Sequence, residues 1–281
     1  RPTPVQVVGL TNVIAIDAGS SHSLALKADG TVWGWGYNGL GQLGDGTTLS
    51  RSTPAQVPGL GGVLDISAGI YHSVVVKLDG TVWSWGYNSY GQLGDGTTTH
   101  RYSPVMVPGI ADGLAVSAGA YSTMLVKQNR TVWGWGYNYY GGLGDGTTHQ
   151  RSSPVQATGI GSVADISAGF YHTLAQRYDG SVWSWGFNSN GQLGDGTTAN
   201  RSTAAQISGF ENSAEVEAGG YFSASRKQDG TVWSWGQNSY GQLGDNTTTT
   251  RSTPGQVQGL VTIIRPFPFP YPYPYEPVFI P

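Results

Sequence analysis

The stretch that decides the fold reads Asp79-Gly80-Thr81-Val82-Trp83-Ser84-Trp85-Gly86, then Asn88, then Gly91-Gln92-Leu93-Gly94-Asp95-Gly96-Thr97-Thr98. This frame returns every 50 residues in nearly fixed register, across residues 1–50, 51–100, 101–150, 151–200 and 201–250, with a partial copy at 251–260. A fixed period of this length indicates a repeat architecture, in which each unit buries its apolar face by stacking on its neighbours. A site made of repeat-invariant residues would occur five times. We therefore expect the common frame to be scaffold and any specific activity to lie where the copies differ.

One repeat contains four short segments that are typical of antiparallel strands. In the second copy they are residues 63–67, 72–77 and 81–85, followed by an outer segment that begins with Pro54 or its successor Pro104. Asp79-Gly80 is a strong signal for a two-residue hairpin turn, whose two central positions both need positive φ. A proline at the start of the outer segment suits an edge strand, where a missing N–H donor costs least. Four strands in about 50 residues predict one blade of a β-propeller.

The frame resembles the repeat of the regulator of chromosome condensation family. The resemblance is carried by Ala-Gly-x-x-His-Ser and by Asp-Gly-x-Val-x-x-Trp-Gly-x-Asn-x-x-Gly-Gln-Leu-Gly, and it covers residues 1–260. It implies a β-propeller, usually of seven blades, with binding functions as different as nucleotide exchange on a small GTPase, inhibition of β-lactamase and ultraviolet sensing in plants. The fold alone does not choose among these functions. Our expectation is an all-β propeller of five four-stranded blades over residues 1–260.

The chain carries one strand more than five blades require. Blades that run from the Ala-Gly strand to the Pro-initiated strand occupy residues 12–60, 62–110, 112–160, 162–210 and 212–260. Residues 1–10 then form an outer strand without a blade of its own. Two interpretations stay open: a closed five-bladed ring with residues 1–10 on an edge, or an open arc completed in trans. An unpaired strand edge is a ready template for pairing with a neighbouring molecule.

Residues 261–281 leave the repeat pattern and predict an extended C-terminal arm. Proline occupies every second position from 266 to 274, and each proline fixes φ and removes a donor, so the arm is stiff. We expect the arm to be a strap on its own domain, a docking segment for another subunit or partner, or a disordered tail. A preordered segment loses little entropy on binding, and its rings would supply the contact area. The aromatic residues of the arm are Phe267, Phe269, Tyr271, Tyr273, Tyr275 and Phe279.

Composition argues against several classes of function. A formal net charge of −3 gives no field that attracts polyanions, so nucleic acid is not an expected partner. No apolar run of about 18 residues is present, so no membrane span is expected. The absence of cysteine excludes disulfides, thiol catalysis and cysteine-ligated metals. No Ser-His-Asp set, paired carboxylates or phosphate-binding loop stands out, so we expect a non-enzyme without catalytic residues, bound metal or cofactor.

Three repeated residue types are interpreted as structural. The Trp pairs of the third strand, such as the one that contains Trp85, are expected to pack between blades. His22, His72 and His172 share one frame position, and a ring of blades would hold them too far apart to ligate a metal. We expect them to form local hydrogen bonds with the backbone. Asp45 and its equivalents lack the clustered carboxylates of a calcium site and should form Asx-type turns or pair with the repeated Arg.

Positions that vary between copies are the better candidates for a binding site. Tyr71, Tyr121, Tyr171 and Tyr221 follow the Ala-Gly turn and should ring one face of the propeller. A second loop position carries another tyrosine in three copies, namely Tyr90, Tyr140 and Tyr240. Exposed tyrosine with little charge around it is favoured at binding surfaces. The alternative, that these rings simply cover neighbouring loops, stays open.

These patterns predict a non-catalytic binding or assembly module that is secreted or held at the cell surface. Low Lys content and Thr-rich loops favour this location, and Asn129, Asn200 and Asn246 are glycosylation acceptors in form if the chain is exported. Arg1 occupies the frame position of Arg51, which indicates a processed or excised product.

The leading hypothesis is a structural protein that assembles with identical subunits, or onto a larger filament, through residues 1–10 and the arm. The alternative is an inhibitor-like propeller that binds a protein partner through its tyrosine-rich face, a small-molecule ligand not being expected. Nucleotide exchange on a GTPase is the weakest hypothesis, because the repeats are uniform and no distinctive wedge insertion interrupts them.

Overall fold

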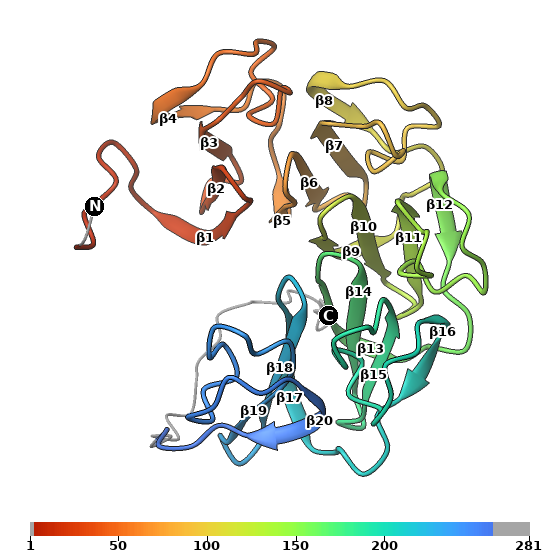
Figure 1. Cartoon of the computed structure of the whole chain (residues 1–281). Helices are drawn as coiled ribbons and strands as arrows, with labels where there is room; N and C mark the ends of the chain where they lie inside the picture. Colours follow the sequence, from red (N-terminus) through yellow and green to blue (C-terminus); the bar gives the residue numbers. More distant parts are fainter. Residues whose placement is uncertain (1–2, 261–281) are drawn as a thin grey trace, which may run out of the picture.

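A computed structural model of the chain describes residues 3–260, and these residues are all β. Twenty strands form five antiparallel sheets of four strands each, and within each sheet the strands pair in chain order. Figure 1 shows the five sheets side by side around a common centre as the blades of a propeller, with the first strand of each blade innermost. Residues 3–260 contain no helix that could cross a membrane. The fold expected from the repeat is confirmed.

The strands keep almost the same bounds in every blade, shifted by 50 residues. In chain order they are β1 (Val13–Ala18), β2 (His22–Lys27), β3 (Val32–Gly36) and β4 (Arg51–Gln56) in blade one; β5 (Val63–Ala68), β6 (His72–Lys77), β7 (Val82–Gly86) and β8 (Arg101–Met106) in blade two; β9 (Gly113–Ala118), β10 (Ser122–Lys127), β11 (Val132–Gly136) and β12 (Arg151–Gln156) in blade three; β13 (Val163–Ala168), β14 (His172–Arg177), β15 (Val182–Gly186) and β16 (Arg201–Gln206) in blade four; and β17 (Ser213–Ala218), β18 (Phe222–Lys227), β19 (Val232–Gly236) and β20 (Arg251–Gln256) in blade five.

The hairpin between the second and third strands differs from the expected two-residue turn. In blade two, the N–H of Gly80 donates to the carbonyl of Lys77 at 2.9 Å, and the N–H of Lys77 donates to the carbonyl of Thr81 at 2.9 Å. Gly80 has a φ of 78°, but Asp79 is not among the residues with positive φ. The expectation of positive φ at both positions is therefore wrong. The loop is a longer hairpin with one left-handed glycine, and the Asp79 side chain accepts a hydrogen bond from the N–H of Thr81 instead.

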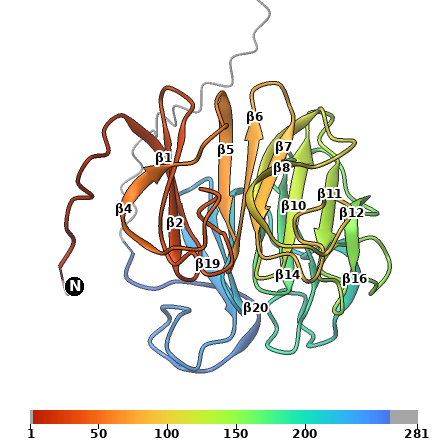
Figure 2. The ribbon, with the colours of Figure 1, turned by 90° about the horizontal axis from the view of Figure 1, so that it is seen from above.

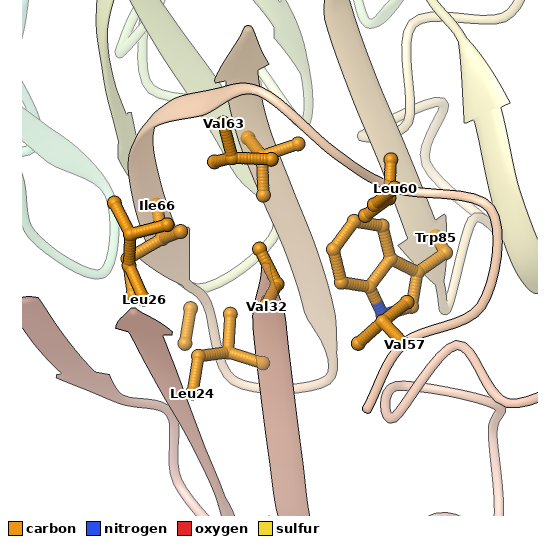
Figure 3. Close-up of a cluster of buried hydrophobic side chains, with 10 residues drawn as sticks. Leu24, Leu26, Val32, Val57, Leu60, Val63, Ile66 and Trp85 are labelled. Atoms are coloured by element: carbon orange, nitrogen blue, oxygen red, sulfur yellow. The ribbon is translucent and has the colours of Figure 1, made fainter. Parts of the chain in front are cut away.

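The hydrophobic core lies between the blades. Figure 3 shows the joint between blades one and two, where Leu24 and Val32 of the first blade meet Ile66 and Trp85 of the second. Trp85 is fully buried, and its Nε1 donates to the carbonyl of Gln42 in the preceding blade at 2.8 Å. The expected packing of tryptophan between blades is confirmed, and truncating a side chain buried in this way typically costs about 3–5 kcal/mol. The next three joints contain equivalent clusters, with Trp135, Trp185 and Trp235 in the place of Trp85.

Each buried histidine binds the neighbouring blade. Nε2 of His72 lies 3.0 Å from Oγ1 of Thr123, and this hydroxyl donates its only proton to the carbonyl of Gln92 at 2.9 Å. Nε2 must therefore be the donor, which leaves Nδ1 unprotonated and without a partner in the part of the chain that the structure describes. The expectation of local bonds to the backbone is wrong, because the partner lies one blade further on. The same arrangement joins His22 to Ser73 and His172 to Ser223.

The arc of blades is open. The inner strands pack in succession from β1 through β5, β9 and β13 to β17, but residues 3–260 show no packing of comparable extent between β17 and β1. Figure 1 shows blades one and five separated at the two ends of the arc. Residues 3–10 form no strand, and Figure 2 shows this segment standing clear of the blades. The outer strand expected over residues 1–10 is not formed by residues 3–10 within the single chain, and the arm from Phe267 to Phe279 lies outside the described residues.

Burial strongly affects the titration of the histidines between blades. It lowers the pKa of His22 to about 4, and that of His72 and His172 to about 3, because a buried ring resists protonation. The unfolded chain then takes up protons below pH 6.5 while the folded chain does not, so stability is lost as the pH falls from 6.5 towards 4. Asp65 acts in the opposite direction, since burial raises its pKa to about 6.

We expect His172→Gln to make the free energy of unfolding less dependent on pH. Between pH 6.5 and 4.5, each buried histidine should contribute a loss of about 1.4 kcal/mol per pH unit, and the variant should remove one such contribution. Urea unfolding at several pH values measures the slope. His149→Gln, at an exposed histidine, is the matched control and should leave the slope unchanged. Equal slopes in the wild-type chain and in His172→Gln would show that the ring is not held neutral.

Candidate functional site

Four of the tyrosines singled out in the sequence lie on one face of the propeller. Tyr71, Tyr121, Tyr171 and Tyr221 each lie in the turn between the first and second strands of blades two to five. The ring centroids of Tyr121 and Tyr171 are 6.5 Å apart, and those of Tyr171 and Tyr221 are 6.2 Å apart. The blades therefore bring residues 50 positions apart in the sequence into ring contact.

The loop after the third strand adds further rings to this face. The N–H of Tyr87 donates to the carbonyl of Tyr71 at 2.9 Å, which fixes the start of this loop beside the turn that carries Tyr71. In the next two blades, the N–H groups of Tyr137 and Phe187 donate in the same way to the carbonyls of Tyr121 and Tyr171. Sequence reasoning missed these residues. The repeat pattern could have predicted them. In a sheet whose antiparallel strands pair in chain order, the third strand ends beside the turn between the first and second strands.

Rings at the second loop position fill the spaces between blades. Tyr90 lies 5.2 Å from Tyr121 and 5.2 Å from Tyr137, so it bridges blades two and three. Tyr140 does the same one blade later, with its centroid 4.6 Å from that of Phe187. The third tyrosine predicted at this position, Tyr240, is 90% exposed and lies outside the cluster.

These rings form one surface, which we call the tyrosine face. It consists of Tyr71, Tyr87, Tyr90, His100, Tyr121, Tyr137, Tyr139, Tyr140, Phe170, Tyr171, Phe187 and Tyr221. Most of its members are half-buried, while Tyr139 is 66% exposed. The inner-turn loops 69–71, 119–121, 169–171 and 219–221 contain no charged residue, and neither do the loops 87–92, 137–142 and 187–192.

The packing of the tyrosine face also affects its phenol groups. Burial, together with the neighbouring phenols of Tyr140 and Tyr171, raises the pKa of Tyr137 to about 12. The pKa values of Tyr121 and Tyr171 are raised for the same reasons. The face is thus an array of ordered rings, most of which carry a hydroxyl group, and it is suited to apolar contact and to hydrogen bonding at once.

The centre of the propeller is a second candidate. The inner strands line a cavity of about 950 Å³, and acidic side chains project from them. Several of these carboxylates hold blades together: Oδ2 of Asp65 accepts the N–H of Val116 at 2.9 Å, and Oδ2 of Asp17 accepts the N–H of Ala68 at 2.8 Å. Within residues 3–260, no group of three or more His, Asp or Glu side chains is placed to hold a metal ion. The cavity therefore has fewer side chains available to bind a ligand than the tyrosine face.

The repeated aspartate of the outer loop acts as a turn and ion-pair residue. Oδ1 of Asp95 accepts the N–H of Thr97 at 3.0 Å and the hydroxyl of the same residue at 2.7 Å. Oδ2 of Asp95 pairs with Arg101 at 2.7 Å. All five copies form this pair, so both parts of the sequence interpretation are confirmed.

The three possible glycosylation acceptors are exposed. Oδ1 of Asn129 accepts the N–H of Thr131 in a hairpin, Oδ1 of Asn200 accepts the N–H of Asn188, and Asn246 has a φ of 60°. Their modification stays a prediction.

Comparison with known proteins identifies matching families. The RCC1-like domain matches residues 1–224, and two descriptions of the regulator of chromosome condensation (RCC1) repeat match residues 229–265 and 214–242. The human E3 ubiquitin-protein ligase HERC2 is 52% identical over 48 residues, which are 17% of this chain and only 1% of HERC2.

Solved structures share the fold. Human WBSCR16 superposes with a TM-score of 0.78 at 24% identity, covering 87% of this chain and 67% of that one. Prp20p from Saccharomyces cerevisiae, described with its binding properties to Gsp1p and histones, gives a TM-score of 0.66 at 19% identity, covering 89% of this chain and 78% of that one. At these identities the likeness concerns the fold alone.

We expect phenol titration to reveal the packed face. In a pH jump followed by phenolate absorbance before unfolding, part of the signal from the 16 tyrosines should appear only well above pH 10. Tyr137→Phe should reduce this late signal, because the pKa of Tyr137 is raised to about 12. Ionisation of all tyrosines in a single phase near pH 10 would contradict the packing described.

Proposed function

Because this chain belongs to the RCC1-like domain family, we propose that it is a non-catalytic propeller that binds a protein partner on its tyrosine face. The family provides a protein-binding fold, and Prp20p is described as binding Gsp1p and histones. The identity of those partners is not carried over to this chain, whose likeness to Prp20p concerns the fold alone. The proposal concerns the surface and the kind of contact that it can make.

The observation that carries this proposal is that the rings are continuous across blades and yet are not needed by the fold. Blade one has Ser21 in place of the first tyrosine, and its carbonyl still accepts the N–H of Tyr37 at 2.7 Å. Blade five has Gln237 in place of the later ring, and its N–H still donates to Tyr221 at 2.9 Å. The backbone hydrogen bond between the two loops thus forms in the same way without the aromatic side chain. Loop covering alone does not account for aromatic residues at these positions in the three middle blades.

The composition of the tyrosine face favours a protein over a small molecule. Its rings bridge neighbouring blades, so the face is a broad, continuous array. Cores of protein interfaces are enriched in aromatic side chains and depleted in charge, and tyrosine is frequent among the residues that dominate binding energy. Rings already held by their neighbours lose little side-chain entropy when a partner docks.

The extracellular location and the attachment to a surface filament remain proposals that rest on the sequence. Low Lys content and Thr-rich loops support export, and the six aromatic side chains from Phe267 to Phe279 support docking of the arm. A filament would need both the arm and residues 1–10 to find partners outside this chain.

We expect Tyr121→Ser together with Tyr171→Ser to weaken partner binding at least tenfold. Serine is the natural residue at this position in blade one, so the fold should be retained. Truncation of central aromatic residues commonly costs about 2 kcal/mol or more in binding, which is roughly 30-fold. The measurement is a titration with the protein that the immobilised wild-type chain captures from its native source. Tyr240→Ser, outside the cluster, is the matched control and should bind like wild type.

Retained affinity in the double variant, with an unchanged urea midpoint, would overturn the assignment of the tyrosine face. Loss of affinity in Tyr240→Ser to the same degree would also contradict it, because that ring is 90% exposed and is not a member of the tyrosine face.

A further inference from the structure

Every internal joint of the arc repeats one set of hydrogen bonds. Between blades one and two, the carbonyl of Gln42 accepts both Nε1 of Trp85 at 2.8 Å and the hydroxyl of Ser73 at 2.8 Å. The N–H of Val63 also donates to the carbonyl of Gly30 at 3.2 Å. The carbonyls that take the place of Gln42 in the other three joints are those of Gln92, Gly142 and Gln192.

Blade one exposes the donor half of such a joint. Trp35 and Ser23 hold the frame positions of Trp85 and Ser73, but among residues 3–260 neither finds the carbonyl that its equivalents bind. Trp35 is half-buried, whereas the four equivalent tryptophans are 0% exposed. Ile16 is 76% exposed, whereas Ile66 at the same position in blade two is 6% exposed. This end of the arc is an apolar surface with two side-chain donors for which the structure gives no partner among residues 3–260.

Blade five exposes the acceptor half. The carbonyl of Gln242 holds the frame position of Gln42, and no Trp or Ser side chain within residues 3–260 donates to it. Leu260 is 57% exposed, whereas Leu60 at the same position in blade one is 5% exposed and packs in the joint.

A glycine beside this acceptor leaves the space that the indole of a joint requires. A Cβ on Gly44 would lie 2.7 Å from Nε1 of Trp85, so a side chain there would block the indole. Gly244 holds the same position in blade five with a φ of 62°, and the atom nearest to a Cβ there belongs to Val257 of the same blade. The space that an indole would occupy beside Gly244 is not filled by any tryptophan of the described chain.

We propose that the blade-one end of this protein docks on the blade-five end of a second copy, forming a fifth joint in trans. The two ends lie apart in one chain, but Trp35 and Ser23 supply the N–H and O–H donors that the carbonyl of Gln242 lacks within residues 3–260. Two blade-one ends would bring donors together without an acceptor, and two blade-five ends would do the reverse. The pairing is therefore head-to-tail, which produces a ring if the rotation closes and a filament if it does not.

The proposed joint lacks the histidine that three of the four internal joints contain, as does the joint between blades three and four, where Ser122 holds this position. Phe222 replaces the histidine in blade five, so the ring that would face Ser23 of the second copy cannot titrate. The trans joint consequently lacks the hydrogen bond between histidine and hydroxyl that joins His72 to Thr123. The rings of blades two to four, among them Tyr121 and Tyr171, lie away from this joint, so the proposal stands independently of the proposed function.

The test is the mass in solution by light scattering, over a wide range of concentration, for the full chain and two variants. Wild type should exceed the 29.6 kDa of one chain as concentration rises. Ile16→Glu blocks the blade-one end and Leu260→Glu the blade-five end, so each variant alone should be a monomer. An equimolar mixture should give a dimer of about twice that mass, because one wild-type joint can still form between the two variants. Leu78→Glu, at a side chain that is 61% exposed in the blade-two hairpin, is the control and should behave as wild type.

Several results would overturn the proposal. A wild-type chain that stays monomeric at every concentration excludes the joint. A mixture of the two variants that remains monomeric shows that no head-to-tail joint forms, and a dimer of either variant alone shows that like ends pair. Assembly that survives Ile16→Glu but is lost on removing residues 261–281 would assign the contact to the arm instead. Tyr121→Ser with Tyr171→Ser should leave the mass unchanged, which separates this test from that of the proposed function.

Discussion

The bond between a buried indole and the carbonyl of the preceding blade is the constraint on which this structure depends. A single blade of four short strands cannot cover its own apolar side chains, so each blade relies on the next. Trp135 is fully buried, donates through Nε1 to the carbonyl of Gln92 at 2.9 Å, and packs over Gly94, where a side chain would collide with it. Because four joints repeat this arrangement, the spacing of the blades is uniform, and every strand end is placed by it.

Uniform spacing leaves the loops free to differ, and the candidate site lies in those differences. The joint sets the distance between neighbouring blades, and that distance places Tyr90 of one blade within 5.2 Å of Tyr121 of the next. The frame does not demand these rings, as Ser21 and Gln237 show by keeping the same backbone bonds. Scaffold and binding surface are thus separable in this chain: the repeated residues hold the arc, and the variable ones give its face a chemical character.

The sequence predicts what is local or periodic and fails where the partner lies in another blade. The three inner strands, the blade, and the contact of Asp95 with Thr97 and Arg101 follow from short-range pattern, whereas the outer strand begins at Arg101 and not at the expected Pro104. The partner of His72 does not, because Thr123 is 51 residues away and becomes a neighbour only when blades stack. Residues 1–10 match the sequence of an outer strand, yet a strand also needs a neighbouring edge, which the single chain does not provide for residues 3–10. The tyrosine face was half predicted, since its first ring position was recognised and the one occupied by Tyr87 was not.

The most direct test of the central claim compares two substitutions of the same kind at a closed and an open joint. Trp135→Phe removes an indole that is buried against Gln92, whereas Trp35→Phe removes one that has no equivalent carbonyl within residues 3–260. In dilute solution of the full chain, urea unfolding should show that Trp135→Phe lowers the free energy of unfolding by roughly 2 kcal/mol, from a lost hydrogen bond and poorer packing. Trp35→Phe should lower it by a small fraction of that amount. Equal losses at the two positions would contradict the account, because they would mean that the indole stabilises its own blade and that the joint is not what holds the arc.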